Sequence, residues 1–171
     1  HLTRLYLTMS NDDHWNDKIL LLGVTGGVAA YKAADLASRW TQRGAKVRVR
    51  MTPSACRFVQ PLTFEAVTRQ PVTTEIWQPL GTGERPEHIG SGDDADLFVI
   101  APASADHLAR LAQGFGDDAV CLTALAWEGP LVICPAMNDR MWRNPAVQAN
   151  VQLLRDRGAT VVDPGVGHLA C

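Results

Sequence analysis

Three runs of consecutive apolar residues constrain the fold of this chain more than any other feature. They span residues 18–25, 95–103 and 129–136, and each is followed by small or polar residues and then by a helical pattern. A strand of a parallel sheet is buried on both faces, so it reads as an unbroken apolar run. A fourth segment, residues 46–52, alternates apolar with basic side chains and reads as one more parallel strand.

The segments between these strands have helical spacing. In residues 28–44, Val28, Leu36 and Trp40 fall close to one helical face, and Gly44 is the expected stop. The other expected elements are helices at 54–60, 61–69, 104–114, 117–127 and 144–158, a last strand at 159–163 and a loop at 79–94. Because strands alternate with helices, we predict an α/β protein with a three-layer Rossmann-like (flavodoxin-like) fold, in which helices cover both faces of a mostly parallel sheet.

Length and charge limit the domain organisation and the class of partner. The 171 residues suit a single domain over residues 18–171, while residues 1–17 read as an N-terminal extension outside the fold. Lys and Arg (16) nearly balance Asp and Glu (18) and are scattered, so no nucleic-acid surface is expected. Without a membrane-length apolar stretch or a signal sequence, we expect a cytoplasmic protein that binds a small molecule and no membrane.

The four cysteines predict neither a disulfide framework nor a metal site. Cys56, Cys121, Cys134 and Cys171 show no CxxC pair and no metal-ligand spacing. Two of them lie in strongly apolar segments, where a reduced thiol simply packs.

The loops after the four strands carry the candidate binding residues. Ligands of open parallel sheets bind beyond the carboxyl ends of the strands, so these loops are expected to form one binding site. Gly26 and Gly27 would let backbone N–H groups approach one phosphate at a helix N-terminus, with the Thr25 hydroxyl beside it. Thr52 and Ser104 follow the next two strands and would add hydroxyls, although each such residue is more often a helix cap. The segment lacks the dinucleotide fingerprint and the lysine of a P-loop.

A single histidine is the candidate general base. His88 lies in a loop rich in glycine and acid, with Glu87 beside it, although a lone loop histidine is more often simply solvated. His14, His107 and His168 do not lie in a comparable glycine-rich segment that leads into a buried strand.

The segment CPAMNDRMW, residues 134–142, is the candidate anion site. Asn138 reads as the cap of a helix, and its amide together with free backbone N–H groups would hold a carboxylate. Capping accounts for Asn138, and core packing would account for Met141 and Trp142. Neither gives a reason for Met137.

These motifs together resemble those of the flavin-dependent cysteine decarboxylases, a homo-oligomeric family. The likeness runs from Lys18 to Cys171. GVTGGVAAYK is similar to the family's flavin-phosphate turn, EHI with ADLFVIAPASAD to its catalytic histidine and the strand behind it, PAMNDRMWRNPAVQANV to its substrate-carboxylate motif, and HLAC to the start of its lid. The third of these motifs is the most specific. The nearest likeness is to members that convert 4'-phosphopantothenoylcysteine to 4'-phosphopantetheine in coenzyme A biosynthesis.

The resemblance implies a role for each candidate residue. The cofactor FMN would be bound at Thr25, Gly26, Gly27, Thr52, Ala103 and Ser104. His88 is implied as the catalytic base, Asn138 with the backbone of Ala136 and Met137 as the carboxylate clamp, and Cys171 as a late proton donor. In the family's chemistry, the flavin oxidises the substrate thiol to a thioaldehyde, carbon dioxide leaves, and the enethiol is reduced.

The sequence departs from the family pattern in two places. Asp106 stands where the family often has asparagine. The family's lid continues past its cysteine with a glycine-rich segment and an arginine, whereas this sequence ends at Cys171, so the lid would be truncated. No ligase domain follows, and the expectation from this sequence is a single activity.

Four other functions are compatible with part of this set of motifs. They are a peptidyl-cysteine decarboxylase of peptide natural-product maturation, a flavin prenyltransferase, a non-catalytic FMN-binding regulator and a plain nucleotide-binding or electron-carrier protein. The complete PAMN segment favours a decarboxylase over a flavin prenyltransferase. The intact residues His88, Asn138 and Cys171 argue against a non-catalytic regulator. The resemblance also implies a homotrimer or a dodecamer of trimers, with Trp77, Trp127 and Trp142 as candidate interface anchors.

Overall fold

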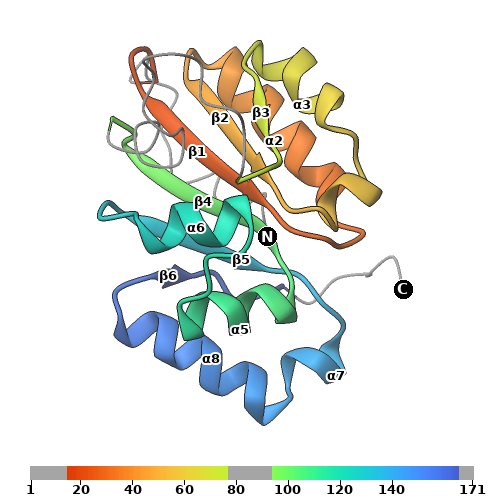
Figure 1. The fold of residues 1–171 in the computed structure, drawn as a ribbon, viewed down its shortest axis with the longest axis vertical. Coiled ribbons are helices and arrows are strands. Elements are labelled where there is room, and N and C mark those ends of the chain that lie inside the picture. Colours follow the sequence, from red (N-terminus) through yellow and green to blue (C-terminus); the bar gives the residue numbers. More distant parts are fainter. Residues whose placement is uncertain (1–14, 77–93, 166–171) are drawn as a thin grey trace.

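In the part of the chain that the structure describes, six parallel strands form one sheet. The computed structural model describes residues 15–76 and 94–165 (Figure 1). The strands are β1 (Ile19–Val24), β2 (Lys46–Met51), β3 (Val72–Thr73), β4 (Leu97–Ala103), β5 (Leu131–Pro135) and β6 (Thr160–Val161). Their order is β3-β2-β1-β4-β5-β6 and every pair is parallel, which is the Rossmann order with its reversal between β1 and β4.

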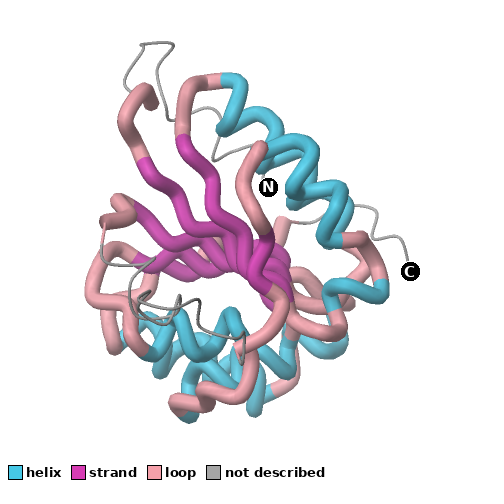
Figure 2. The backbone as a smooth tube through the Cα atoms, turned by 45° about the horizontal axis from the view of Figure 1, so that its top comes forward, coloured by secondary structure: helices cyan, strands magenta, loops and turns pink. Residues whose placement is uncertain are grey.

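Helices cover both faces of this sheet. They are α2 (Ala30–Gln42), the short 3-10 helix η1 (Ala55–Arg57), α3 (Pro61–Thr68), α5 (Ala105–Gln113), α6 (Ala119–Leu125), α7 (Asp139–Trp142) and α8 (Pro145–Asp156). Helices α2 and α3 lie on one face, and α5, α6 and α8 lie on the other (Figures 1 and 2). The predicted three-layer α/β arrangement is confirmed.

The core consists of two apolar clusters, one on each face of the sheet. Alternation along β1 sends Leu20 and Leu22 into the cluster under α2 and α3, and Leu21 into the cluster under α5 and α8. Leu36 and Trp40 of α2 are buried in the first cluster, as their spacing predicts. No described helix is both long and apolar enough to cross a membrane.

Two expectations about the elements need correction, and one short strand was not expected. Val28 lies in the turn before α2 rather than on its buried face, and its side chain is 45% exposed. Residues 54–60 contain only η1, because Gln60 precedes Pro61 and takes an extended backbone that a helix cannot include. The edge strand β3 has two residues, too few for any periodicity to predict.

Candidate functional site

Hydrogen bonds tie the four strand-to-helix loops together at the carboxyl edge of the sheet. The N–H of Thr52 donates to the carbonyl of Val24 (3.1 Å), which joins the β2 loop to β1. The Thr25 hydroxyl donates to the carbonyl of Pro102 (2.7 Å) and accepts from the N–H of Ser104 (2.9 Å), which joins the β1 loop to the β4 loop. The predicted binding loops are therefore held as one unit.

The Thr25 hydroxyl does not have the role that the sequence suggested. The residue is fully buried, and its hydroxyl both donates and accepts inside the protein. Thr52 is similar, because it is 1% exposed and its hydroxyl accepts from the N–H of Ala55 (3.1 Å). Both threonine hydroxyls therefore hold the loops in place. For Thr52, this is the local capping role that such residues have more often than a ligand contact.

The turn after β1 leaves several backbone donors without a partner. Within the described chain, nothing accepts a hydrogen bond from the N–H groups of Gly26, Gly27 or Val28. A Cβ on Gly26 would come within 2.5 Å of the Ser54 Cβ, so only glycine lets the β1 and β2 loops meet this closely. A Cβ on Gly27 would meet nothing within 4 Å, so the backbone there is open to a ligand.

Helix α2, which begins at this turn, also lacks a side-chain cap and has no acidic residue in its first turn. By contrast, α5, α6, α7 and α8 are each capped by a Ser, Asp or Asn side chain. Uncapped N–H groups at a helix N-terminus favour a bound anion. The turn at Gly26 and Gly27 therefore fits a phosphate group.

Ser104 and Ala103 complete the β4 side of the edge. Ser104 is half-buried, and its hydroxyl caps α5 by accepting from the N–H of His107 (3.3 Å). Ala103 is fully buried, and its carbonyl accepts from the N–H of Ala136 (3.0 Å), which joins the β5 loop to β4. The Ala136 N–H is thus already used and is not available to the predicted carboxylate clamp.

Asn138 combines a structural bond with a free donor group. Its side-chain oxygen caps α7 by accepting from the N–H of Met141 (2.9 Å), as predicted. This fixes the amide so that its NH2 group points away from the helix, and no described residue accepts from that group or from the N–H groups of Met137 and Asn138. The exposed Asn138 therefore presents donors suited to a carboxylate.

The hydrophobic residues of this segment are divided between core and surface. Met137 and Trp142 are half-buried against the cluster under α5 and α8, which gives Met137 a packing role that the sequence did not suggest. Met141 is 45% exposed rather than a core contact. Trp127 packs its ring edge-on against Phe98 at a centroid distance of 6.0 Å, as a core residue does.

His88, Cys171 and Trp77 lie outside the described residues. The site that the structure shows consists of the phosphate-type turn, Ser104 and the Asn138 segment. The assignments of His88 and Cys171 remain predictions.

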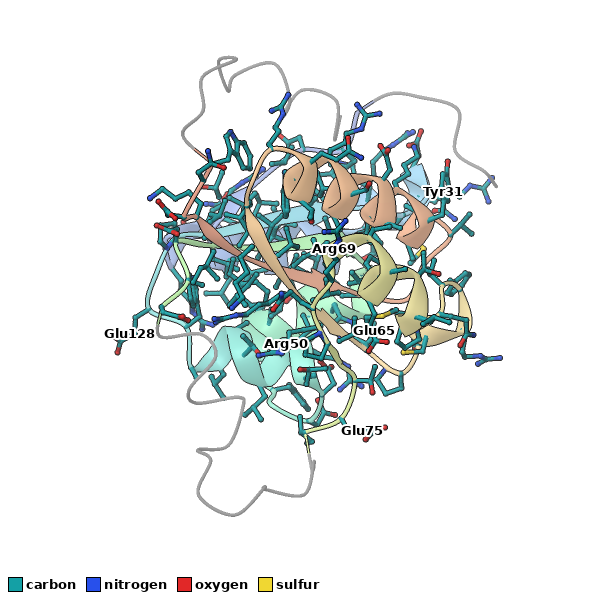
Figure 3. The ribbon with its side chains drawn as sticks, turned by 90° about the horizontal axis from the view of Figure 1, so that it is seen from above. Tyr31, Arg50, Glu65, Arg69, Glu75 and Glu128 are labelled. Carbon is teal, nitrogen blue, oxygen red and sulfur yellow. The ribbon has the colours of Figure 1, made fainter. Side chains whose placement is uncertain are left out.

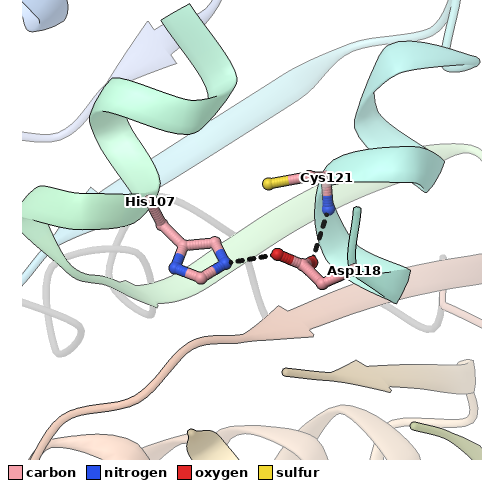
Figure 4. Close-up of side chains that lie close together, drawn as sticks. All are labelled: His107, Asp118 and Cys121. Atoms are coloured by element: carbon pink, nitrogen blue, oxygen red, sulfur yellow. Dashed lines mark hydrogen bonds and ion pairs between the residues drawn. The ribbon is translucent and has the colours of Figure 1, made fainter. Parts of the chain in front are cut away.

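A second polar cluster lies behind Ser104, and sequence reasoning missed it. His107 Nε2 lies 2.9 Å from Asp118 Oδ2, and the side chains of both are at most 10% exposed (Figure 4). Although burial raises the pKa of Asp118, hydrogen bonds from His107 and from the N–H of Cys121 hold it at about 2. Burial and the Asp118 carboxylate raise the pKa of the neighbouring Cys121 thiol, and burial raises that of Cys134 to about 11. The Cys121 and Cys134 thiols should therefore be poor nucleophiles.

Asp118→Asn is expected to lower the free energy of unfolding by about 1–2 kcal/mol at neutral pH, because asparagine still caps α6 but loses the charge that pairs with His107. The pKa of Asp118 is lowered in the folded state, so its stabilisation exists above the ordinary pKa and disappears as the pH falls from 3.8 towards about 2. Urea denaturation at several pH values measures this difference. A difference that persisted at the lowest pH would contradict the charge argument.

Comparison with known proteins finds relatives over most of this chain. The Flavoprotein family matches residues 8–171. The coenzyme A biosynthesis bifunctional protein CoaBC of Bacillus subtilis (strain 168) is 44% identical over 156 residues, which cover 91% of this chain and 38% of that protein. CoaBC of Mycobacterium tuberculosis (strain ATCC 25618 / H37Rv) is 43% identical over 152 residues, 89% of this chain and 36% of that protein. This chain therefore spans well under half the length of these relatives.

Solved structures agree in fold over most of both chains. The FMN-dependent cysteine decarboxylase SpaF is 37% identical with a TM-score of 0.80, covering 86% of this chain and 85% of that one. A PPC decarboxylase mutant complexed with pantothenoylaminoethenethiol is 32% identical with a TM-score of 0.78, covering 91% and 86%. The fold and site define a Rossmann-like binding domain with an anion-binding turn. The chain belongs to the Flavoprotein family.

Proposed function

We propose that this chain is an FMN-dependent decarboxylase that converts 4'-phosphopantothenoylcysteine to 4'-phosphopantetheine in coenzyme A biosynthesis. One observation supports this proposal most: an open phosphate-type turn after β1 and a donor-bearing Asn138 segment after β5 lie at the same edge of the sheet. A phosphorylated cofactor and a substrate carboxylate need two such sites. The CoaBC relatives and the PPC decarboxylase structure point to the same substrate.

The free N–H groups of Gly26, Gly27 and Val28 would hold the FMN phosphate. Ser104, half-buried at the end of β4, would contact the flavin nucleotide with its hydroxyl. Thr25, Thr52 and Ala103 would act indirectly, since their polar groups join the loops to one another. Bound FMN would supply the two-electron oxidation of the substrate thiol and the later return of those electrons.

The chain's own residues would position the substrate and move its protons. The Asn138 amide and the N–H groups of Met137 and Asn138 would bind the carboxylate that is lost. His88 would take the proton of the substrate as it is oxidised, and Cys171 would return a proton to the carbon from which carbon dioxide left. Both assignments rest on the sequence motifs EHI and HLAC.

The likeness to a solved structure of EpiD in complex with the substrate peptide DSYTC (25% identical, TM-score 0.76) supports a second candidate, a decarboxylase that acts on the cysteine of a peptide. The decisive experiment offers the flavin-loaded protein 4'-phosphopantothenoylcysteine and a peptide ending in cysteine in the same reaction, and follows both by mass spectrometry. We expect decarboxylation of the small molecule only. Preferential loss of carbon dioxide from the peptide would replace the proposal by its alternative.

We also propose that the protein acts in the cytoplasm as a homotrimer or a dodecamer of trimers. Apolar side chains at one end of the α2 and α3 layer are exposed, among them Tyr31 (58%), Phe58 (53%) and Leu62 (71%), and Figure 3 shows Tyr31 at the first turn of α2. Contact between copies would bury such residues. Light scattering measures the mass, and a monomer at micromolar concentration would contradict this part of the proposal.

Gly27→Ala is expected to weaken FMN binding at least ~10-fold without lowering the stability of the apoprotein, because the new methyl group occupies only the space that the ligand needs. Gly26→Ala is the matched control, and it should instead destabilise the apoprotein by roughly 1–3 kcal/mol, because its methyl group meets Ser54. Flavin fluorescence and urea denaturation measure the two effects. Unchanged FMN affinity in Gly27→Ala would remove this turn from the cofactor site.

A further inference from the structure

The pair of His107 and Asp118 lies directly behind Ser104, one of the proposed flavin contacts. His107 is in the first turn of α5, which Ser104 caps, and Asp118 caps α6. His107 Nε2 is 2.9 Å from Asp118 Oδ2, and His107 Nδ1 is 3.5 Å from Ser104 Oγ. Three side chains from two helices thus form a chain that ends at the carboxyl edge of the sheet.

Asp118 determines which nitrogen of the ring carries a proton. Its Oδ1 accepts from the N–H groups of Val120 (2.8 Å) and Cys121 (2.9 Å), so the carboxylate is anchored and ionised at neutral pH. An ionised carboxylate only accepts hydrogen bonds, so His107 must present Nε2–H to Oδ2 (Figure 4). In the neutral ring, the remaining nitrogen, Nδ1, is therefore an acceptor facing Ser104.

The direction of the Ser104 hydroxyl then depends on the charge of the ring. Beside a neutral ring, the hydroxyl can donate its proton to Nδ1, which lies 3.5 Å away, and would then point inward. In the protonated ring, Nδ1–H is a donor, so Ser104 Oγ accepts from it as well as from the N–H of His107. The single hydroxyl proton of Ser104 is then free to point to an acceptor at the sheet edge.

We propose that His107 is a proton-linked positioning residue, which turns the Ser104 hydroxyl toward the bound ligand when the ring is protonated. This inference rests on the proposed function, because it takes FMN as the ligand that Ser104 contacts. Binding of FMN would favour the protonated ring, and by linkage FMN would bind more tightly at lower pH.

Other charged groups near the ring do not replace this coupling. Asp106 Oδ2 lies 3.9 Å from His107 Nδ1 and is paired with Arg110 at 2.8 Å, and Arg110 also binds Asp117 at 2.6 Å. The Cys121 sulfur lies within 4.8 Å of the ring and the carboxylate, and its thiol stays neutral. On the α8 side, Arg157 binds the carbonyl of Ala112 at the opposite end of α5.

A double-mutant cycle tests this inference through the affinity for FMN, measured by flavin fluorescence at about pH 6 and about pH 8. The proteins are the wild type, His107→Gln, Ser104→Ala and the double variant, with Thr123→Val as control. Thr123 is buried in α6, and its one hydrogen bond among the described residues goes to the carbonyl of Ala119, so its variant should match the wild type. Titration of the FMN phosphate is common to all five proteins and cancels in the comparison.

We expect His107→Gln to weaken FMN binding ~10-fold at the lower pH and little at the higher pH, and to have no further effect once Ser104 is alanine. An equal effect of His107→Gln in both Ser104 backgrounds, or one independent of pH, would overturn the inference, since the histidine would then be only structural. Asp118→Asn, which keeps the cap, should reproduce the loss of pH dependence if His107→Gln folds poorly. One equivalent of bound zinc that Cys121→Ser removes would also overturn it. Failure of the wild type to bind FMN would instead contradict the proposed function.

Discussion

Asn138→Asp is expected to reduce kcat/KM for 4'-phosphopantothenoylcysteine by ~100-fold or more while the protein keeps its fold and FMN. Aspartate caps a helix as well as asparagine does, so the bond to the N–H of Met141 survives the substitution. The substitution exchanges only the outward NH2 group for a negatively charged oxygen, which repels the substrate carboxylate. Steady-state kinetics with the flavin-loaded protein measure the loss.

Asn144→Asp is the matched control for this experiment. Asn144 caps α8 through the same kind of bond, from the N–H of Ala146 to its side-chain oxygen (2.9 Å), and it is also exposed. The same substitution there should leave kcat/KM within about twofold of the wild type, because surface changes away from a site have small effects. Equal losses in the two variants, or none in either, would contradict the assignment of Asn138 to the carboxylate.

His88→Asn is expected to abolish carbon dioxide release, with a loss in rate of ~10²–10⁴-fold, while FMN stays bound. Asparagine is close to histidine in size but cannot accept a proton at neutral pH, so the variant removes the proposed base and little else. Visible absorbance reports the bound flavin, and trapping of labelled carbon dioxide reports turnover.

His14→Asn provides the comparison for this variant, because His14 belongs to the N-terminal segment that the proposed chemistry does not use. It should decarboxylate the substrate at the rate of the wild type. Normal turnover by His88→Asn would show that another group is the base, and loss of flavin from it would show that His88 holds the cofactor.

The sequence was sufficient to predict the elements that repeat a simple pattern. Unbroken apolar runs predict β1, β4 and β5 to within one residue at their C-terminal ends and two at their N-terminal ends. Gly44, with φ +95°, ends α2 where the spacing required a stop. Parallel strands place their carboxyl ends at one edge, so the gathering of Gly26, Ser104 and Asn138 there also follows from the sequence pattern.

The sequence did not predict what depends on partners far along the chain. The Thr25 hydroxyl is occupied by Pro102 and Ser104, which are 77 and 79 residues away, so its sequence position alone suggested a ligand contact. His107 looked unremarkable because Asp118, its partner, belongs to another helix. One signal was available: Asp118 precedes an apolar helix as a cap, and a histidine in the first turn of the helix before it lies within reach once the helices pack.

The most direct test of the decarboxylase assignment is the mass of the product formed when the protein, reconstituted with FMN, is incubated with 4'-phosphopantothenoylcysteine. We predict flavin absorbance bands in the loaded protein and a product lighter than the substrate by one carbon dioxide. Unchanged substrate in the presence of fully bound flavin, or a protein that cannot be loaded with FMN at all, would contradict the assignment.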